Sequence, residues 1–391
     1  EQYFKAQRGD WRLLEMPRRV LAHRLTLQNQ ALSLKFNLPE LTSADDLLTF
    51  DLPKVQVVDM RKELTSGNSS VLSRSLESKL EKVLAKNQQA ILFLNRRGQA
   101  TYVFCRHCGH SLRCPNDDQP LTWHGSQQGL LCHLCGYTRK LPVKCPNCGS
   151  NQIRQLGLGT QKLEELVKIR FPEARILRWD ADTTKNKDDH ELILSHFSAH
   201  RADILIGTQM LAKGLDLPLV TLVGIVLAEV GLNLPDYRAA ERSFQVLTQV
   251  SGRAGRSPLG GEVVLQTYQP ENYVIQAASK HDFPKFYKQE LDYRRLLAYP
   301  PFSRLIRLEF RHLSQSKAEQ EARQLAAVIS DQIESKGLRQ TDLIGPLPAY
   351  YSRLHGLWRW QIILRGSKPE VLLPDLPLRD WQVEVDPPSL L

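Results

Sequence analysis

The sequence has no long apolar run, and most of its length lacks cysteine. No stretch approaches the roughly 18–20 consecutive apolar residues that a membrane-spanning helix requires. No basic segment followed by an apolar one opens the chain as a secretory signal does. We therefore expect a cytoplasmic protein with no membrane partner. The first residue is Glu1 rather than Met, which we interpret as the sign of a fragment or a processed chain.

Acidic residues are fewer than basic ones, and the excess indicates the kind of partner. The 391 residues include 52 Lys and Arg against 42 Asp and Glu, a formal net charge of +10. A basic balance of this size favours a polyanion, most often nucleic acid. A soluble protein that is merely basic has the same composition, so charge alone does not decide between the two.

Short apolar runs alternate with amphipathic stretches from Val55 onward, which predicts an α/β fold with a parallel sheet. We expect strands at 55–60, 90–95, 174–180, 202–208, 219–229 and 261–268, and helices at 73–88, 160–171, 188–198 and 236–255. This α/β unit spans residues 51–270, and a cysteine-rich insertion, 104–150, interrupts it. Residues 1–50 are mixed in character.

The pattern changes after Pro270. The stretch 299–313 opens with Pro-Pro and continues with alternating strand residues, 316–335 is helical in pattern, and 359–366 predicts another strand. We therefore expect a small α+β domain over residues 271–391.

The seven cysteines form a pattern that is typical of zinc binding. Three Cys-x-x-Cys pairs stand at 105/108, 132/135 and 145/148, and a glycine follows each pair. Two thiolates on a tight turn that glycine completes make a zinc knuckle. A redox Cys-x-x-Cys is the alternative, but such motifs come singly at the start of a helix.

Ligand counting predicts two zinc sites of four ligands each, and the seven cysteines leave the second site one thiolate short. If the pairs are nested, Cys105, Cys108, Cys145 and Cys148 form one site, and Cys114, Cys132 and Cys135 remain for the other. Asp117 stands where a fourth Cys-x-x-Cys would place its second cysteine. It is a candidate ligand, and His110, His124 and His133 are alternatives. Otherwise Asp117 faces solvent and the second site is weak or empty. Either way the zinc is expected to be structural, because no open catalytic position is indicated.

Two stretches of the α/β unit carry polar residues suited to phosphate chemistry. One is "ILIGTQMLAKGLD", residues 204–216, and the other is "QVLTQVSGRAGR", residues 245–256. Ligands bind at the carboxyl ends of parallel strands, and paired arginines beside glycines stabilise phosphate charge. Taken alone, the second stretch is equally well explained as a solvated helix end with basic residues.

Together these stretches resemble motifs V and VI of superfamily 2 helicases. With "FLNRRG", the cysteine insertion, "FPEARILRWDADTT" and "IGPLPAYYSRLHGLWRWQIIL", the chain resembles the PriA family of primosomal replication-restart helicases from Val55 to its C-terminus. The resemblance implies a RecA-like second helicase lobe at 51–270, a remnant of lobe one and a linker at 1–50, and a C-terminal domain at 271–391 that binds DNA and partner proteins.

The resemblance also implies roles for single residues. Arg253 and Arg256, with Gln249 on the same helix, are the expected catalytic residues that reach the ATP phosphates. Gly214 and Asp216 belong to the nucleotide site and couple it to DNA. The residues expected to line the path of single-stranded DNA are Thr208, Gln209, Lys213, Arg96 and Arg97.

The implied function is that of an ATP-dependent 3′→5′ DNA helicase that unwinds stalled or repaired forks and directs primosome assembly. The implied cofactors are two Zn²⁺, with ATP and Mg²⁺ requiring the first lobe. The implied partners are DNA, single-stranded-DNA-binding protein and primosome proteins at the bacterial nucleoid.

Two motifs of the family are missing from this sequence. The 391 residues contain no Gly-x-x-x-x-Gly-Lys-[Ser/Thr] and no Asp-Glu-x-His stretch, so we expect the chain to be inactive by itself. The alternative function is a non-enzymatic, zinc-dependent DNA-binding or primosome scaffold. A zinc-ribbon protein of transcription or RNA handling is a third possibility, which the arginine pair disfavours.

Overall fold

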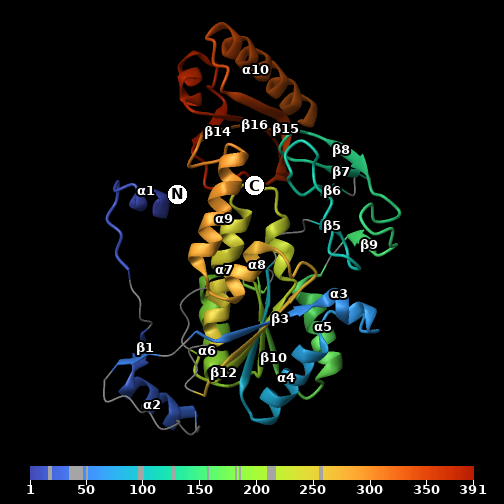
Figure 1. Ribbon diagram of the computed structural model, residues 1–391, viewed down its shortest axis with the longest axis vertical. Coiled ribbons are helices and arrows are strands. Elements are labelled where there is room, and N and C mark those ends of the chain that lie inside the picture. The colour runs from blue at the N-terminus through green and yellow to red at the C-terminus, as the bar shows by residue number, and fades with distance from the viewer. Residues whose placement is uncertain are drawn as a thin grey trace.

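A parallel sheet, an antiparallel sheet and a cysteine-rich segment make up the computed structural model (Figure 1). The structure describes residues 1–15, 20–34, 47–49, 52–95, 101–124, 129–155, 158–180, 183–184, 186–208, 217–254 and 259–391. In Figure 1 the parallel sheet and its helices form the lower lobe, the antiparallel sheet lies at the top, and the cysteine-rich segment stands between them at one side.

Six parallel strands form the sheet of the lobe, in the order β10-β11-β4-β12-β13-β3. They are β3 (Lys54–Asp59), β4 (Gln89–Leu94), β10 (Ile176–Trp179), β11 (Ile204–Gly207), β12 (Val220–Val226) and β13 (Glu262–Thr267). Every residue of β4 and β12 is buried, because helices cover both faces. The predicted α/β class and parallel sheet are confirmed.

Helices pack on the two faces of this sheet through apolar stripes of helical period. The first face holds α3 (Met60–Thr65), α4 (Arg74–Ala85) and α5 (Thr160–Arg170), and the second holds α6 (Lys187–Ser198), α7 (Ala239–Ala254), α8 (Tyr273–Ser279) and α9 (Phe283–Leu296). Leu76 and Leu80 of α4 are fully buried. The Ser73 hydroxyl caps this helix by accepting a hydrogen bond from the Leu76 backbone N–H at 3.2 Å.

The helices α8 and α9 belong to the core of the lobe, although the sequence pattern grouped them with the C-terminal domain. Val274 and Phe286 lie in the same apolar cluster as Phe244 of α7. The Phe244 and Phe286 rings stack with centroids 4.3 Å apart. The domain bounds stay a prediction, but the packing places residues 273–296 with the parallel sheet.

The C-terminal sheet is antiparallel and has the order β15-β16-β14-β17. Its strands are β14 (Arg304–His312), β15 (Asp342–Leu354), β16 (Leu357–Gly366) and β17 (Trp381–Val385), accompanied by α10 (Gln315–Ser335) and the 3-10 helix η3 (Pro369–Asp375). Ala322, Leu325 and Ile329 of α10 pack on the sheet. The α+β character predicted for this part of the chain is confirmed, but β15 and β17 were not anticipated.

The cysteine-rich segment forms small antiparallel strands between β4 and α5, which confirms an insertion in the lobe. They are β5 (Thr101–Cys105), β6 (Thr122–His124), β7 (Gly129–Leu131), β8 (Thr138–Lys140) and β9 (Ile153–Gln155). The order β8-β7-β6-β5-β9 brings the two ends of the insertion together, because β5 pairs with β9.

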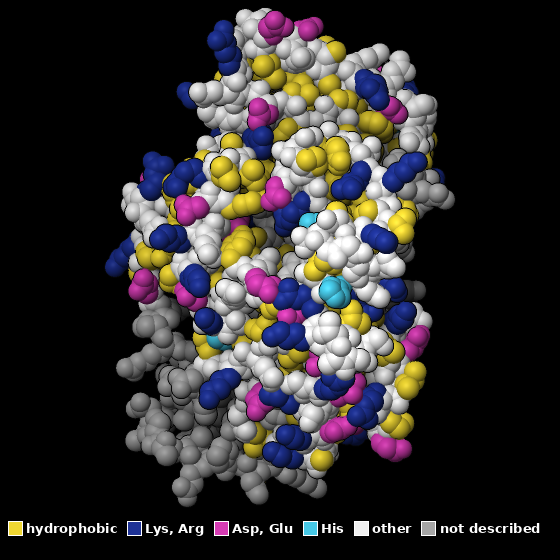
Figure 2. Space-filling view, turned by 45° about the vertical axis from the view of Figure 1, so that its right-hand side comes forward, with side chains coloured by type: hydrophobic (Ala, Val, Ile, Leu, Met, Phe, Trp, Pro, Cys, Tyr) yellow, Lys and Arg dark blue, Asp and Glu magenta, His cyan; other side chains and the backbone are white. Residues whose placement is uncertain are grey.

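On the face in Figure 2, Lys and Arg are spread over the molecule with acidic side chains between them.

The N-terminal residues form separate short elements. They are α1 (Gln2–Gln7), β1 (Val20–His23), α2 (Arg24–Leu34) and β2 (Leu47–Thr49), and β1 pairs with β2. Tyr3 packs edge-on against Phe283 and Tyr287 of α9. Among the described helices, none has the length and apolar character that a membrane crossing needs.

Candidate metal centres and motor residues

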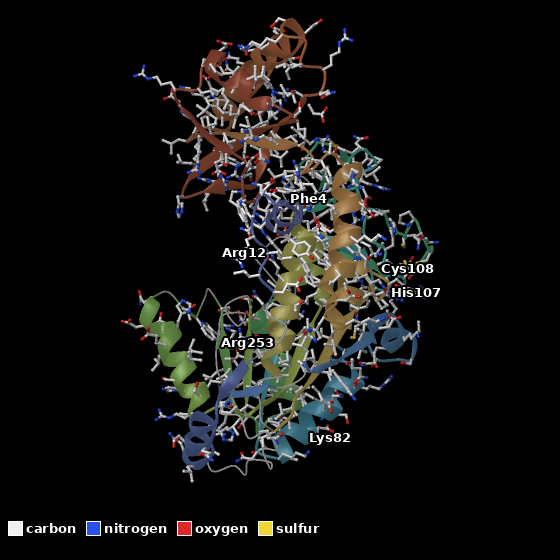
Figure 3. The ribbon with its side chains drawn as sticks, turned by 60° about the vertical axis from the view of Figure 1, so that its left-hand side comes forward. Phe4, Arg12, Lys82, His107, Cys108 and Arg253 are labelled. Carbon is white, nitrogen blue, oxygen red and sulfur yellow. The ribbon has the colours of Figure 1, made fainter. Side chains whose placement is uncertain are left out.

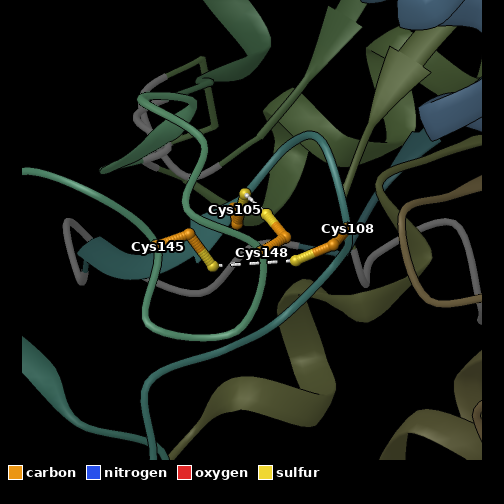
Figure 4. A group of neighbouring side chains, drawn as sticks. All are labelled: Cys105, Cys108, Cys145 and Cys148. Carbon is orange, nitrogen blue, oxygen red and sulfur yellow. Dashed lines mark hydrogen bonds between the residues drawn. The ribbon is translucent and has the colours of Figure 1, made fainter.

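The outer cysteine group has the geometry of a tetrathiolate zinc site. The four Sγ atoms of Cys105, Cys108, Cys145 and Cys148 lie within 4.8 Å of one another. Cys105 Sγ is 3.7 Å from Cys148 Sγ, and Cys108 Sγ is 3.7 Å from Cys145 Sγ (Figure 4). Tetrahedral zinc with bonds of about 2.3 Å places its sulfurs about 3.8 Å apart. These four residues therefore fit zinc without rearrangement.

The inner group combines three thiols with the carboxylate of Asp117. Its ligand atoms, from Cys114, Asp117, Cys132 and Cys135, also lie within 4.8 Å of one another. Asp117 Oδ2 is 3.6 Å from Cys114 Sγ and 3.5 Å from Cys132 Sγ. A tetrahedral zinc with one oxygen ligand requires about 3.6 Å between oxygen and sulfur. The nested pairing predicted from the sequence is thus the arrangement that the structure brings together.

The backbone around Asp117 forms a fourth knuckle, which the sequence pattern did not reveal. In the three Cys-x-x-Cys turns, the glycine N–H donates to the carbonyl of the first cysteine at 2.8–3.0 Å, with φ of +71° to +79°. Asp118 N–H donates to the Cys114 carbonyl at 3.0 Å, and its φ is +50°. Asp is among the few residues other than glycine that adopt this conformation readily. Asp118 therefore takes the place of the glycine, and the turn aims Asp117 as the others aim their second cysteine.

The histidines considered as alternative ligands belong to neither group within the described residues. The buried His133 ring lies edge-on against Tyr350 of β15, 5.2 Å between centroids. Burial is the main cause that lowers the pKa of His110, and the positive charges of Arg113 and Arg139 lower it further. The side chain of His124 lies outside the described part of the chain.

The outer site has one thiol that ionises readily. Burial raises the pKa of the Cys108 thiol, but hydrogen bonds from the His110 backbone and the Asn147 amide outweigh it and lower the pKa to about 7. Asn147 Nδ2 lies 3.6 Å from Cys108 Sγ. Zinc binds the thiolate, so a thiol with a lowered pKa has fewer protons to release when the metal binds.

The first turn of the outer group, Cys105–Gly109, is called the outer knuckle, and it packs against the end of strand β13. Gln269 Nε2 donates to the Gly109 carbonyl at 3.0 Å and to Ser111 Oγ at 2.7 Å. Arg106 Nε donates to Tyr268 Oη at 3.0 Å. A Cβ at Gly109 would lie 2.0 Å from the Tyr268 carbonyl oxygen. The first knuckle is therefore packed against the lobe with no space for a side chain.

We expect Gly109→Ala to destabilise the protein by about 2–4 kcal/mol, because alanine meets both the positive φ and the Tyr268 backbone. Gly149→Ala is the matched control, since Gly149 has φ of +71° and no atom lies within 4 Å of the point that its Cβ would occupy. It should cost about 1 kcal/mol. Denaturant unfolding of both variants measures the difference, and equal losses would contradict the close packing.

The Cys132–Gly136 turn of the inner group, called the inner knuckle, faces the C-terminal sheet instead. A Cβ at Gly136 would lie 2.8 Å from Leu347 Cδ2 of β15. Leu134, Leu305 and Ile363 share one apolar cluster with Cys114 and Cys132. The cysteine-rich segment thus joins the parallel-sheet lobe to the C-terminal sheet through its two candidate metal groups.

Replacing Asp117 with cysteine should tighten the inner site, because zinc prefers thiolate to carboxylate ligands. We expect the second zinc to be held at least about tenfold more tightly. Competition with a chromophoric chelator measures this affinity, and Asp118→Asn, which keeps the positive-φ position without adding a ligand, is the control. If Asp117→Ala binds the second zinc as tightly as the unchanged chain, Asp117 is not a ligand.

Few of the predicted motor residues lie in the described part of the chain. Arg253 is buried at the last turn of α7, in view in Figure 3, and Gln249 is exposed one turn earlier. Thr208 directly follows β11, and its N–H donates to the Trp179 carbonyl at 3.4 Å. The predicted residues outside the described part are Arg96, Arg97, Gln209, Lys213, Gly214, Asp216 and Arg256.

A buried carboxyl follows β12, and the sequence pattern gave it no role. Glu229 lies in the 3-10 helix η2 (Ala228–Asn233) and is fully buried. Its Oε1 accepts a hydrogen bond from the Tyr268 backbone N–H at 3.1 Å. Burial raises the pKa of Glu229. The residue ties the end of β12 to the strand end on which the outer knuckle rests.

Comparison with known families places this architecture in a class. Residues 150–258 match the family described as "Helicase conserved C-terminal domain". The parallel-sheet lobe is therefore of the helicase C-terminal, RecA-like class. Residues 295–388 match the family described as "Primosomal protein N C-terminal domain".

Curated relatives narrow the class to one family. The chain is 46% identical over 328 residues to replication restart protein PriA of Synechocystis sp., covering 83% of this chain and 39% of the relative. It is 41% identical over 365 residues to PriA of Bacillus subtilis, covering 93% and 42%, and 40% identical over 315 residues to PriA of Chlamydia muridarum, covering 80% and 41%. The resemblance to the PriA family is confirmed, and the chain spans about two fifths of the length of these relatives.

Proposed function

We propose that this chain is the C-terminal part of an ATP-dependent 3′→5′ DNA helicase of the PriA type. The observation that carries the proposal is the combination of a helicase-class lobe, a cysteine-rich insertion between β4 and α5, and a primosomal C-terminal domain in one chain. The whole protein would unwind DNA at stalled or repaired forks and direct primosome assembly. Its place would be the bacterial cytoplasm at the nucleoid.

In this proposal the residues of the lobe act on nucleotide and DNA. Arg253 and Arg256 stabilise charge on the ATP phosphates, because guanidinium groups bind phosphate oxygens in pairs. Burial at the end of α7 holds Arg253 in place for this role. Gln249, Gly214 and Asp216 support the nucleotide site. The path of single-stranded DNA follows Thr208, Gln209, Lys213, Arg96 and Arg97.

The two metal groups have a structural role in the proposal. Zinc would supply the cross-links that a segment with so small a core needs in order to fold. The cysteines and Asp117 hold it, and the surrounding contacts then fix the segment between the two sheets. DNA, single-stranded-DNA-binding protein and primosome proteins are the proposed partners of the assembled surface.

The domain arrangement follows the same proposal. Residues 51–270 form lobe two, with the zinc-binding insertion at 104–150, and residues 271–391 form the C-terminal domain. Residues 1–50 are the end of lobe one and the linker. A primosome or DNA-binding scaffold without ATPase activity is the second candidate.

The 391-residue chain alone should hydrolyse ATP no faster than a heat-denatured sample, with or without single-stranded DNA. Phosphate cradling and Mg²⁺ placement require a P-loop, which the sequence does not contain. Phosphate release measured by a coupled assay tests this. Hydrolysis that DNA stimulates, and that Arg253→Ala abolishes, would contradict the dependence on a first lobe.

A further inference from the structure

A groove of about 830 Å³ opens at the N-terminal edge of the parallel sheet, beside α4. Its lining comes from the starts of β3, β12 and β13, the loop 259–261 and one flank of α4. The volume falls within the range of about 300–1,000 Å³ that is usual for binding pockets. The roles proposed above for the lobe leave this groove without a function.

Helix α4 sorts its charges onto two flanks. Leu76, Leu80 and Val83 face the sheet. Glu77 and Glu81, on one flank, both pair with Arg170 of α5, at 3.1 and 2.6 Å. Lysines at positions 79, 82 and 86 repeat at helical spacing along the opposite flank and line the groove. The two carboxylates therefore share one arginine on the α5 side of the helix, whereas the basic flank faces the groove.

The groove keeps a positive balance. Its lining includes Lys54, Lys79, Lys82 and Lys86 against Glu262, which gives +4 − 1 = +3. Lys79 forms an ion pair with Glu262. Among the described residues, no ion pair is found for the other three lysines. Their charges are available to an anionic partner.

The lining also includes aliphatic side chains, here called the floor, beside the polar side chains of Gln56, Gln88 and Thr221. Val83 and Leu222 of this floor are buried, and Leu52 and Leu259 contribute further aliphatic surface. Neither an aromatic side chain nor an arginine is among its described lining residues. Single-stranded nucleic acid is usually held by aromatic stacking as well as positive charge. A lysine rim over an aliphatic floor suits carboxylates that flank an apolar side chain.

We propose that this groove is a docking site for an acidic peptide segment of a partner protein, with its carboxylates on Lys54, Lys82 and Lys86 and an apolar side chain on the floor. The groove lies at the strand starts, whereas Thr208 follows the end of β11. In Figure 3 Lys82 stands at the lower end of the lobe, away from Arg253. The lysine side of the groove is therefore apart from these motor residues, whereas the loop 259–261 on its other side packs against the end of α7, where a Cβ at Gly261 would lie 1.9 Å from the Ala254 carbonyl oxygen. The binding test does not depend on the helicase proposal.

A fluorescein-labelled dodecapeptide of alternating Asp and Leu tests the site by anisotropy with the full chain. We expect a dissociation constant in the micromolar range, weakened at least tenfold by the double variant Lys82→Glu/Lys86→Glu. Lys317→Glu, an exposed charge reversal on α10, should change the affinity less than twofold. The milder variant Lys82→Gln/Lys86→Gln serves as a second test if charge reversal reduces the melting temperature.

The competing occupant is separated in the same assay. Unlabelled oligothymidylate should not displace the peptide from the groove, and its own affinity for the chain should be equal in the unchanged chain and the double variant. No peptide binding, or binding that both double variants leave unchanged, would overturn the proposal. Displacement by oligothymidylate, with loss of oligothymidylate affinity in the double variant, would overturn it in favour of a nucleic-acid groove.

Discussion

Replacing Cys145 with serine should leave the chain with one firmly held zinc in place of two, and should unfold the segment around it. Cys145 is buried and its Sγ lies 3.7 Å from that of Cys108. Serine offers no thiolate, so the outer site is left with three sulfur ligands. Structural zinc contributes on the order of 10 kcal/mol to the folding of small metal domains, which is more than the small core of this segment replaces.

Zinc per chain, measured by atomic emission, and limited proteolysis of residues 101–155 check this result. Asn147→Ala is the matched control, because Asn147 lies on the same turn and only donates to Cys108 Sγ. It should keep two zincs and the proteolysis pattern of the unchanged chain. Two zincs in the Cys145→Ser protein, with the segment still resistant to protease, would refute the assignment of the outer site.

Substituting Arg253 should have the second large effect, on the ATPase activity of the protein encoded by the whole reading frame. Arginines that contact transferring phosphate contribute about 10³-fold or more to turnover. We therefore expect Arg253→Ala to lower DNA-stimulated ATP hydrolysis by about a thousandfold. Arg253→Lys should recover little of it, because a lysine does not make the paired contacts of guanidinium.

A structural loss is distinguished from a loss of phosphate contact by three accompanying measurements. Zinc content, melting temperature and DNA affinity should stay close to those of the unchanged protein. Arg323→Ala is the control, because Arg323 lies on the exposed side of α10 and pairs with Glu319 there. If Arg253→Ala retains full hydrolysis, the predicted role in the nucleotide site is wrong.

The elements of the lobe follow from sequence because their signals are local. Strands β4 and β12 are largely apolar runs, which is typical of buried strands, and the leucines of α4 recur at the spacing of a helix. The placement of α8 and α9 depends on tertiary packing between rings such as Phe244 and Phe286, which no local period records. Strand β15 contains Pro346 and Pro348, and its register shifts where they lie, so the pattern typical of a strand is interrupted.

The metal groups were predictable from spacing, with one informative gap. A Cys-x-x-Cys pair followed by glycine predicts a tight metal-binding turn. The division of the seven cysteines into two groups could therefore be predicted by nesting the pairs. The spacing marked Asp117 as a candidate partner of Cys114, but the turn itself was not visible, because Asp118 stands where the other turns have glycine. Its positive φ and its hydrogen bond to the Cys114 carbonyl become evident only in three dimensions. The contacts of each knuckle with a different sheet are equally absent from the sequence.

We propose that this chain is the second lobe and C-terminal part of a DNA helicase. Strand displacement by the protein encoded by the whole reading frame, on a forked duplex with a single-stranded arm, tests it most directly. We expect displacement that requires ATP, that moves 3′→5′ on the strand the protein follows, and that Arg253→Ala abolishes. DNA binding without any ATP-dependent displacement would contradict the claim and favour the scaffold.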